Sequence, residues 1–284
     1  MSTDTATAVP SARERSSATE GARITFGSLV AAERIGLSSL RGNRAALFIG
    51  IALVILPSAG LSVLYGTEFR GPDGGAALLE WMPSPAELAL NGSIFALAIA
   101  VIVGAGAYAK EHATGSLRTQ LAAAPRRTGV LGAKALVVGA SLFAGSLVAF
   151  ALALAASAGL SALFGMPIGL GDPFADAVLP VIGTALSVSL VGVFSLGLAA
   201  LLRSETWTVT LALVFLLVAP MILATLPWEW GPAISELLLG STSQTLVQTP
   251  LEITGDLLRD LALTIGWAAA AFVGGAIAMN RRDA

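Results

Sequence analysis

The chain has no cysteine, a single histidine and few charges, with Asp, Glu, Lys and Arg making up only 12% of its 284 residues. The lack of cysteine excludes disulfides, thiolate metal sites and cysteine nucleophiles. Soluble domains contain about 25% charged residues, so this chain lacks the polar surface that a water-soluble globule needs. Hydrophobic residues make up 55% of it and its mean hydropathy is +0.82, so most of the chain is expected to lie in lipid.

Motifs for self-contained chemistry are missing as well. The sequence has no HExxH, GxSxG or GxxxxGK[ST], which are signatures of zinc hydrolases, serine hydrolases and P-loop nucleotide sites. The histidine, His112, has no acidic cluster beside it in sequence and is interpreted as a surface or structural residue. We therefore expect no enzymatic activity, metal, cofactor or nucleic-acid binding in this chain itself.

Six apolar segments are long enough to cross a membrane, which takes about 20 residues of helix. They cover residues 45–64, 88–109, 135–158, 177–202, 206–227 and 261–280. None of them carries a formal charge, and ionisable groups within the membrane are what mark proton and cation pathways. An ion relay is therefore not expected, although sodium sites built only from carbonyl and hydroxyl oxygens stay open.

The charges between these segments alternate in sign. All but two of the 16 Lys and Arg residues lie before the first segment, after the second, after the fourth or at the C terminus; the exceptions are Arg70 and Arg259. Because Lys and Arg are retained on the cytoplasmic face, both termini are predicted to be cytoplasmic. The expected fold is an all-α integral membrane protein with six transmembrane helices, in which residues 1–24 form a disordered cytoplasmic tail and residues 25–284 the membrane domain.

Two cytoplasmic segments stand out from ordinary loops. Residues 26–44, just before the first span, predict an amphipathic helix in the membrane interface, although Glu33 intrudes into its apolar arc. Residues 110–134 begin with a pattern that fits a short helix, in which Glu111, Gly115 and Arg118 share one face. Such a helix suits insertion into a groove on a partner. The alternatives are a simple basic membrane anchor and an ordinary basic loop.

A third segment, residues 228–259 on the acidic side, is too apolar for a solvated loop and too short in each half to cross the membrane. Short re-entrant or interfacial helices fit it, and Trp228 and Trp230 suit the interfacial aromatic belt. It is expected to act either as an outer gate or as a cap that closes the end of the bundle.

The stretch Glu111-His112-Ala113-Thr114-Gly115-Ser116-Leu117-Arg118, continuing through Pro125 to Lys134, resembles the E-x-x-x-G-[ST]-x-R coupling segment of bacterial ABC-2 (type V) ABC transporter permeases. The segment from Ala32 to Arg44 is similar to the amphipathic connecting helix of that family. Six spans and a long outer segment before the sixth complete the resemblance, which covers residues 25–284.

The resemblance implies a permease subunit in a bacterial cytoplasmic membrane that works as a dimer with a second copy or a paralogue. Two separate ATPase subunits would bind ATP and Mg. By motif match, Glu111, Gly115, Ser116 and Arg118 form the ATPase-coupling loop, and Glu33, Arg34 and Arg41 lie on the connecting helix. We expect export of a hydrophobic or amphipathic molecule, such as a drug, an antibiotic or a lipid-like compound. The rival functions are a non-transporting anchor or sensor subunit and an ion-coupled secondary carrier.

Overall fold

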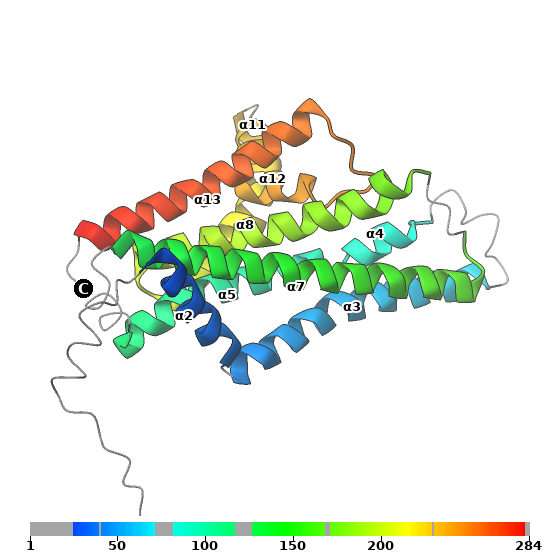
Figure 1. Cartoon of the computed structure of the whole chain (residues 1–284). Coiled ribbons are helices and arrows are strands. Elements are labelled where there is room, and N and C mark those ends of the chain that lie inside the picture. Colours follow the sequence, from blue (N-terminus) through cyan, green and yellow to red (C-terminus); the bar gives the residue numbers. More distant parts are fainter. Residues whose placement is uncertain are drawn as a thin grey trace, which may run out of the picture.

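The computed structural model describes residues 25–39, 41–71, 82–116, 127–167, 171–228 and 230–281, and within them the side chains other than those of residues 37–47 and 127. These ranges form helices and the turns between them, with no strand (Figure 1). The predicted tail, residues 1–24, lies outside the described residues.

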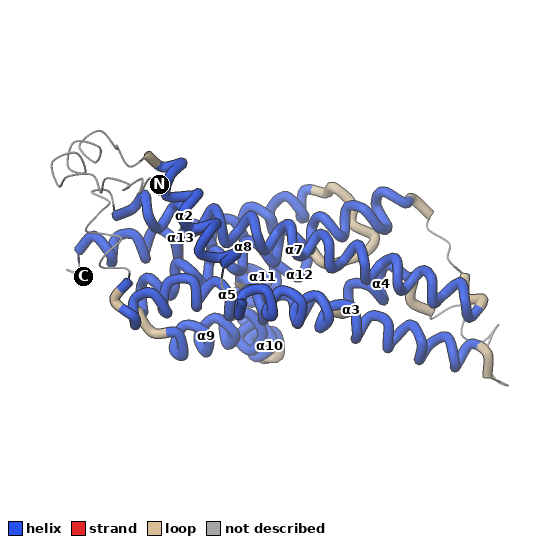
Figure 2. The backbone as a smooth tube through the Cα atoms, turned by 60° about the horizontal axis from the view of Figure 1, so that its bottom comes forward, coloured by secondary structure: helices blue, strands red, loops and turns tan. Residues whose placement is uncertain are grey.

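Within the described ranges, six helical segments are long and apolar enough to span a membrane, which confirms the predicted all-α fold. The described elements are α2 (Phe26–Ser39), α3 (Arg41–Phe69), α4 (Pro85–Leu90), α5 (Ser93–Thr114), α7 (Arg127–Phe164), η2 (Phe174–Val178), α8 (Leu179–Leu202), α9 (Glu205–Leu213), η3 (Val214–Val218), α10 (Ala219–Ala224), α11 (Trp230–Leu237), α12 (Leu239–Thr245) and α13 (Gly255–Arg281). Several helices run past the predicted span ends; α7, for example, extends beyond 135–158 at both ends. α2 and the C-terminal end of α13 lie at the same end of the bundle (Figure 2), and we call this the α2 end.

α8 forms the centre of the bundle and contacts α5, α7 and α13. Its buried face is rich in small residues, which lets neighbouring backbones approach closely. A Cβ on Gly104 of α5 would collide with the backbone carbonyl of Gly192, and Gly197 meets the backbone of Ala271 on α13 in the same way. These glycines therefore allow α8 to pack closely against α5 and α13.

The second predicted span is broken into two helices. α4 ends at Leu90, and α5 begins at Ser93 after a turn in which Gly92 lies against the backbone of Val54 on α3. Ser84 and Glu87 form a capping box at the start of α4: the Ser84 N–H donates to Glu87 Oε2 (2.6 Å) and the Glu87 N–H donates to Ser84 Oγ (3.2 Å). α4 therefore has its own start signal and does not depend on α5 for its first turn.

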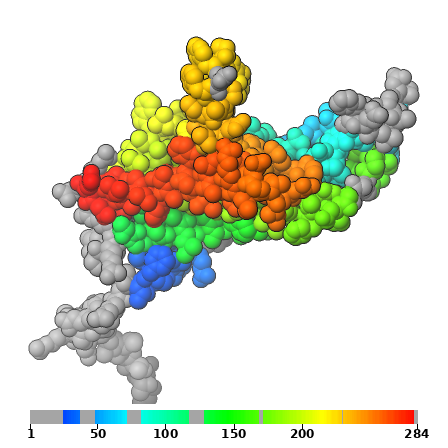
Figure 3. Space-filling model, turned by 90° about the horizontal axis from the view of Figure 1, so that it is seen from above, coloured from blue at the N-terminus to red at the C-terminus, as the bar shows by residue number. Residues whose placement is uncertain are grey.

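The expected short helices of residues 228–259 are present as α11 and α12. Leu238, Leu239 and Leu246 are buried against the bundle. Trp267 of α13 donates its indole N–H to the Leu237 carbonyl (2.8 Å). The region that includes α10 and α11 projects from the long body of the molecule (Figure 3). The segment therefore buries part of its apolar residues against the other helices, while Trp228 and Trp230 stay exposed with their rings stacked.

Candidate functional site

The predicted connecting helix exists as α2 and packs against the N-terminal part of α7 (Figure 1). Its first turn is closed by Thr25 and Ser28, each of whose side chains accepts a hydrogen bond from the other's backbone N–H. The Phe26 ring lies beside Gly132 of α7. The face of α2 that we expected to meet lipid is thus at least partly turned toward another helix.

Glu33, the residue that interrupts the apolar arc of α2, meets a buried lysine on α7. Lys134 Nζ donates to Glu33 Oε2 at 2.8 Å and to Glu111 Oε1, at the end of α5, at 2.7 Å. The side chain of Lys134 is 2% exposed, that of Glu33 13% and that of Glu111 29%. These three residues, which we call the Lys134 hub, connect α2, α5 and α7 through one ammonium group.

The hub contains two carboxylates and one ammonium group. A buried lysine is tolerated only when its charge is paired and hydrogen-bonded, so Lys134 depends on both partners. The second oxygen of Glu111, Oε2, is buried and has no hydrogen-bond partner among the described groups. The hub therefore keeps one unused acceptor at the end of α5.

α5 ends directly beyond the hub. Gly115 adopts the left-handed conformation (φ 74°) and its N–H donates to the His112 carbonyl, which is a common way to stop a helix. Ser116 Oγ folds back to donate to the Glu111 carbonyl (3.3 Å). α5 therefore ends before Gly115, so Glu111 and Gly115 do not lie within one continuous helix. Arg118, the third residue of the predicted helical face, lies outside the described residues.

The remaining predicted site residues make no described contact with the hub. Arg34 is exposed on α2. Arg41 is the first residue of α3, and its side chain lies outside the described part. Arg118 lies outside the described residues. The structure therefore brings together Glu33 and Glu111, with Gly115 and Ser116 adjacent to them.

Lys134 is the functional residue that the sequence analysis missed, since it was placed in a basic loop. It lies in the second turn of a continuous helix rather than between helices. The one signal for it was Glu33, because an acidic residue within an apolar arc needs a cationic partner. A second ion pair nearby, Lys110 Nζ to Glu205 Oε1 at 3.4 Å, links α5 to α9, but its side chains are 66% and 38% exposed, so it contributes little.

The hub is suited to mechanical connection rather than to catalysis. Within the described ranges, no three His, Cys, Asp or Glu side chains gather in a way that could hold a metal ion. The hub has no nucleophile paired with a base. It joins the middle of α2 to the last turn of α5 and the beginning of α7, beside the glycine that ends α5.

No curated protein matches the chain. The model of a protein family described as "ABC-2 family transporter protein" matches residues 10–284. That match covers α2, the Lys134 hub and all six candidate spans, and the chain belongs to the ABC-2 family of transporter membrane proteins.

Proposed function

We propose that the chain is the permease subunit of an ATP-driven exporter in a bacterial cytoplasmic membrane, with the α2 end in the cytoplasm. It pairs with a second copy or a paralogue and with two ATPase subunits, which bind ATP and Mg. Its substrate is a hydrophobic or amphipathic molecule moved outward. The proposal is supported by the family match and by the basic character of the loops predicted on the cytoplasmic side.

The Lys134 hub is the observation that favours energy input from a partner. Gly115 and Ser116 lie just beyond the hub, where a cytoplasmic protein can reach them, while Glu111 is tied inward to Lys134. We assign contact with the ATPase to the segment from Gly115 through Arg118, and we assign to Glu111 the transfer of that contact into α5 and α7. Glu33 extends the connection to α2, the helix that also carries Arg34 and that leads to Arg41.

Close helix packing supports transfer of motion into the membrane. α5 lies against α8 at Gly104 and Gly192, and α8 lies against α13 at Gly197. No side chain separates these backbones. A displacement of α5 is therefore expected to move α8, and through it α13, by a similar amount. This is the arrangement expected of a subunit that is moved by a partner.

The proposal is tested with the full-length chain, purified with its copurifying ATPase and reconstituted in proteoliposomes. We expect ATP-dependent movement of a lipophilic fluorescent substrate that persists when ion gradients are collapsed. Glu111→Lys places a second positive charge beside Lys134, so it is expected to reduce substrate-stimulated ATP hydrolysis at least severalfold. Glu252→Lys is the matched control, because Glu252 is exposed and lies outside every described ion pair.

Three outcomes count against the proposal. Transport that stops when the ion gradients are collapsed, and that does not depend on ATP, indicates a secondary carrier. A stable ATPase complex that moves no substrate indicates an anchor or sensor subunit. Equal ATPase stimulation in Glu111→Lys and in the wild type contradicts the role of the hub.

A further inference from the structure

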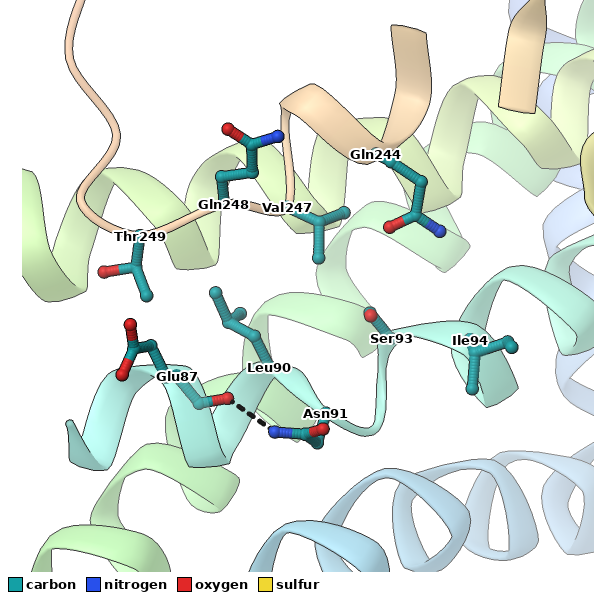
Figure 4. Close-up of a pocket in the computed structure, with 9 residues that line it drawn as sticks. All are labelled: Glu87, Leu90, Asn91, Ser93, Ile94, Gln244, Val247, Gln248 and Thr249. Atoms are coloured by element: carbon teal, nitrogen blue, oxygen red, sulfur yellow. Dashed lines mark hydrogen bonds between the residues drawn. The ribbon is translucent and has the colours of Figure 1, made fainter. Parts of the chain in front are cut away.

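An open cavity of about 620 Å³ lies where the α4–α5 break faces the chain that follows α12 (Figure 4). It is separated from the Lys134 hub by most of the length of α5. Its lining combines polar and apolar side chains, namely Glu87, Leu90, Asn91, Ser93, Ile94, Gln244, Val247, Gln248 and Thr249. Neither the family match nor the proposed coupling assigns a role to this cavity.

The break between α4 and α5 creates one wall. Glu87, Asn91 and Ile94 are each exposed and follow one another at spacings of four and three residues. Asn91 Nδ2 donates to the Glu87 carbonyl (2.9 Å), which fixes the amide at the turn (Figure 4). The Glu87 carboxylate extends toward Thr249 on the opposite wall (Figure 4).

The polar groups of this cavity have unused hydrogen-bonding capacity. One oxygen of Glu87, Oε2, accepts the capping hydrogen bond from Ser84, but no Lys, Arg or His among the described residues pairs with this carboxylate. The side-chain amides of Gln244 and Gln248 make no hydrogen bond to any described residue. Glu87 is the one formally charged residue among those that line the cavity. Its negative charge is not balanced by any described cation.

An exposed carboxylate that no described cation balances favours a ligand that brings a positive charge, because an ammonium group attracts it and can donate charge-assisted hydrogen bonds to it. Ile94 is exposed at the cavity and offers an apolar surface, while Leu90 and Val247 are buried in the core and present only small apolar edges to it. Cavities of roughly 300–1,000 Å³ are the usual size for small organic ligands. A neutral lipid-like molecule would leave Glu87 unpaired, and a small inorganic cation would leave the apolar wall unused.

We propose that this cavity binds an amphipathic organic cation, with its ammonium group at Glu87 and its apolar body against Ile94 and the adjoining edges of Leu90 and Val247. As a substrate site it rests on the proposed transport function, and it narrows the substrate class from hydrophobic or amphipathic molecules to those that carry a positive charge. The amides of Gln244 and Asn91 supply further hydrogen-bond acceptors for the ammonium protons.

The test uses the full-length chain in lipid nanodiscs and two probes that differ in one charge: a dansylated long-chain primary amine and its N-acetyl derivative. We expect the ammonium probe to bind about tenfold more tightly than the neutral one, because one charge-assisted hydrogen bond typically contributes about that factor to the affinity. Glu87→Gln should abolish that preference. Glutamine still serves in a capping box, so this variant removes the charge and keeps the start of α4.

Two control variants separate charge from structure. Ser84→Ala weakens the cap but keeps the carboxylate, so it should retain the preference for the ammonium probe. Glu252→Gln removes an exposed carboxylate elsewhere, so it should behave as the wild type and report any general attraction of cations to the surface. If Glu87→Gln binds the ammonium probe as the wild type does, or if Ser84→Ala loses the preference equally, the proposed site is wrong.

Transport assays separate this proposal from the proposed function. Binding that depends on Glu87, without ATP-driven movement in the complex, supports the cavity and contradicts the permease function. ATP-driven transport that treats the charged and neutral probes alike, and is unchanged in Glu87→Gln, supports the permease function and overturns the cavity.

Discussion

Replacing Lys134 by methionine removes the one positive charge of the Lys134 hub while keeping a flexible chain of similar length. The two carboxylate oxygens that contact Nζ lie at most about 5.5 Å apart, because their distances to it are 2.8 and 2.7 Å. Two negative charges at that separation repel by about 3 kcal/mol at an effective dielectric constant of about 20. Removing one partner of a buried ion pair typically costs about 3 to 5 kcal/mol. Lys134→Met should therefore release Glu33, and with it α2, from α7.

The separation of α2 from α7 can be measured by cysteine cross-linking, because the chain has no cysteine of its own to react. Cysteines introduced at Phe26 and Gly132, which lie side by side across the α2–α7 contact, can be joined by a short bismaleimide. We expect efficient cross-linking in the otherwise wild-type chain and a severalfold slower reaction in Lys134→Met. The thermal midpoint of the purified protein should fall as well.

The matched control neutralises the whole hub. In the triple variant Glu33→Gln, Glu111→Gln, Lys134→Met no charge remains to repel, so cross-linking should recover at least partly relative to Lys134→Met. If Lys134→Met cross-links at the wild-type rate, or if the triple variant is no better than the single one, the hub does not hold α2 through charge pairing.

Two further predictions concern glycines. Gly104→Val drives a branched side chain into the Gly192 backbone and should lower stability by about 1 to 3 kcal/mol, seen as a lower thermal midpoint; Gly60→Val, on an open face of α3, is its control. Gly115→Ala forces a Cβ into the left-handed conformation at a cost of about 1 to 2 kcal/mol, and should reduce substrate stimulation of the partner ATPase more than Gly159→Ala, which has open space and ordinary helical backbone. Equal effects in either pair would contradict the assigned role of that glycine.

The number of spans, the short helices before the last span and the family could be predicted from the sequence. Each of them depends on a long hydropathy pattern or on a local motif. Span lengths were underestimated for a physical reason. Charged residues such as Lys134 were used to mark helix ends, whereas a helix continues past a charge that finds partners. Composition alone does not show that two carboxylates, 101 and 23 positions away from Lys134, meet it in space.

The backbone turn that ends α5 at Gly115 was not predicted. Periodicity placed Glu111 and Gly115 on one helical face, but it is blind to the backbone conformation that a glycine permits. The α4–α5 break was missed although Asn91-Gly92 is a dipeptide typical of turns, because apolar residues on both sides of it were assigned to a single span. The turn brings Gly92 against the backbone of α3. Both omissions lie where a short-range backbone feature overrides a long apolar pattern.

The break also determines how motion at the Lys134 hub would reach the cavity. α4 packs chiefly on α7, whereas α5 packs chiefly on α8, so the turn at Asn91 and Gly92 separates two groups of helices. Glu111 and Ser93 are joined by 18 residue steps of uninterrupted helix, about 27 Å at 1.5 Å per residue. A helix of that kind transmits an axial displacement instead of absorbing it, so a pull on Glu111 should move Ser93 and Ile94 while the capping box keeps the start of α4 in place. In the proposed function, that relative movement changes the wall around Glu87, which is how energy delivered at one end of α5 can alter cation binding at the other.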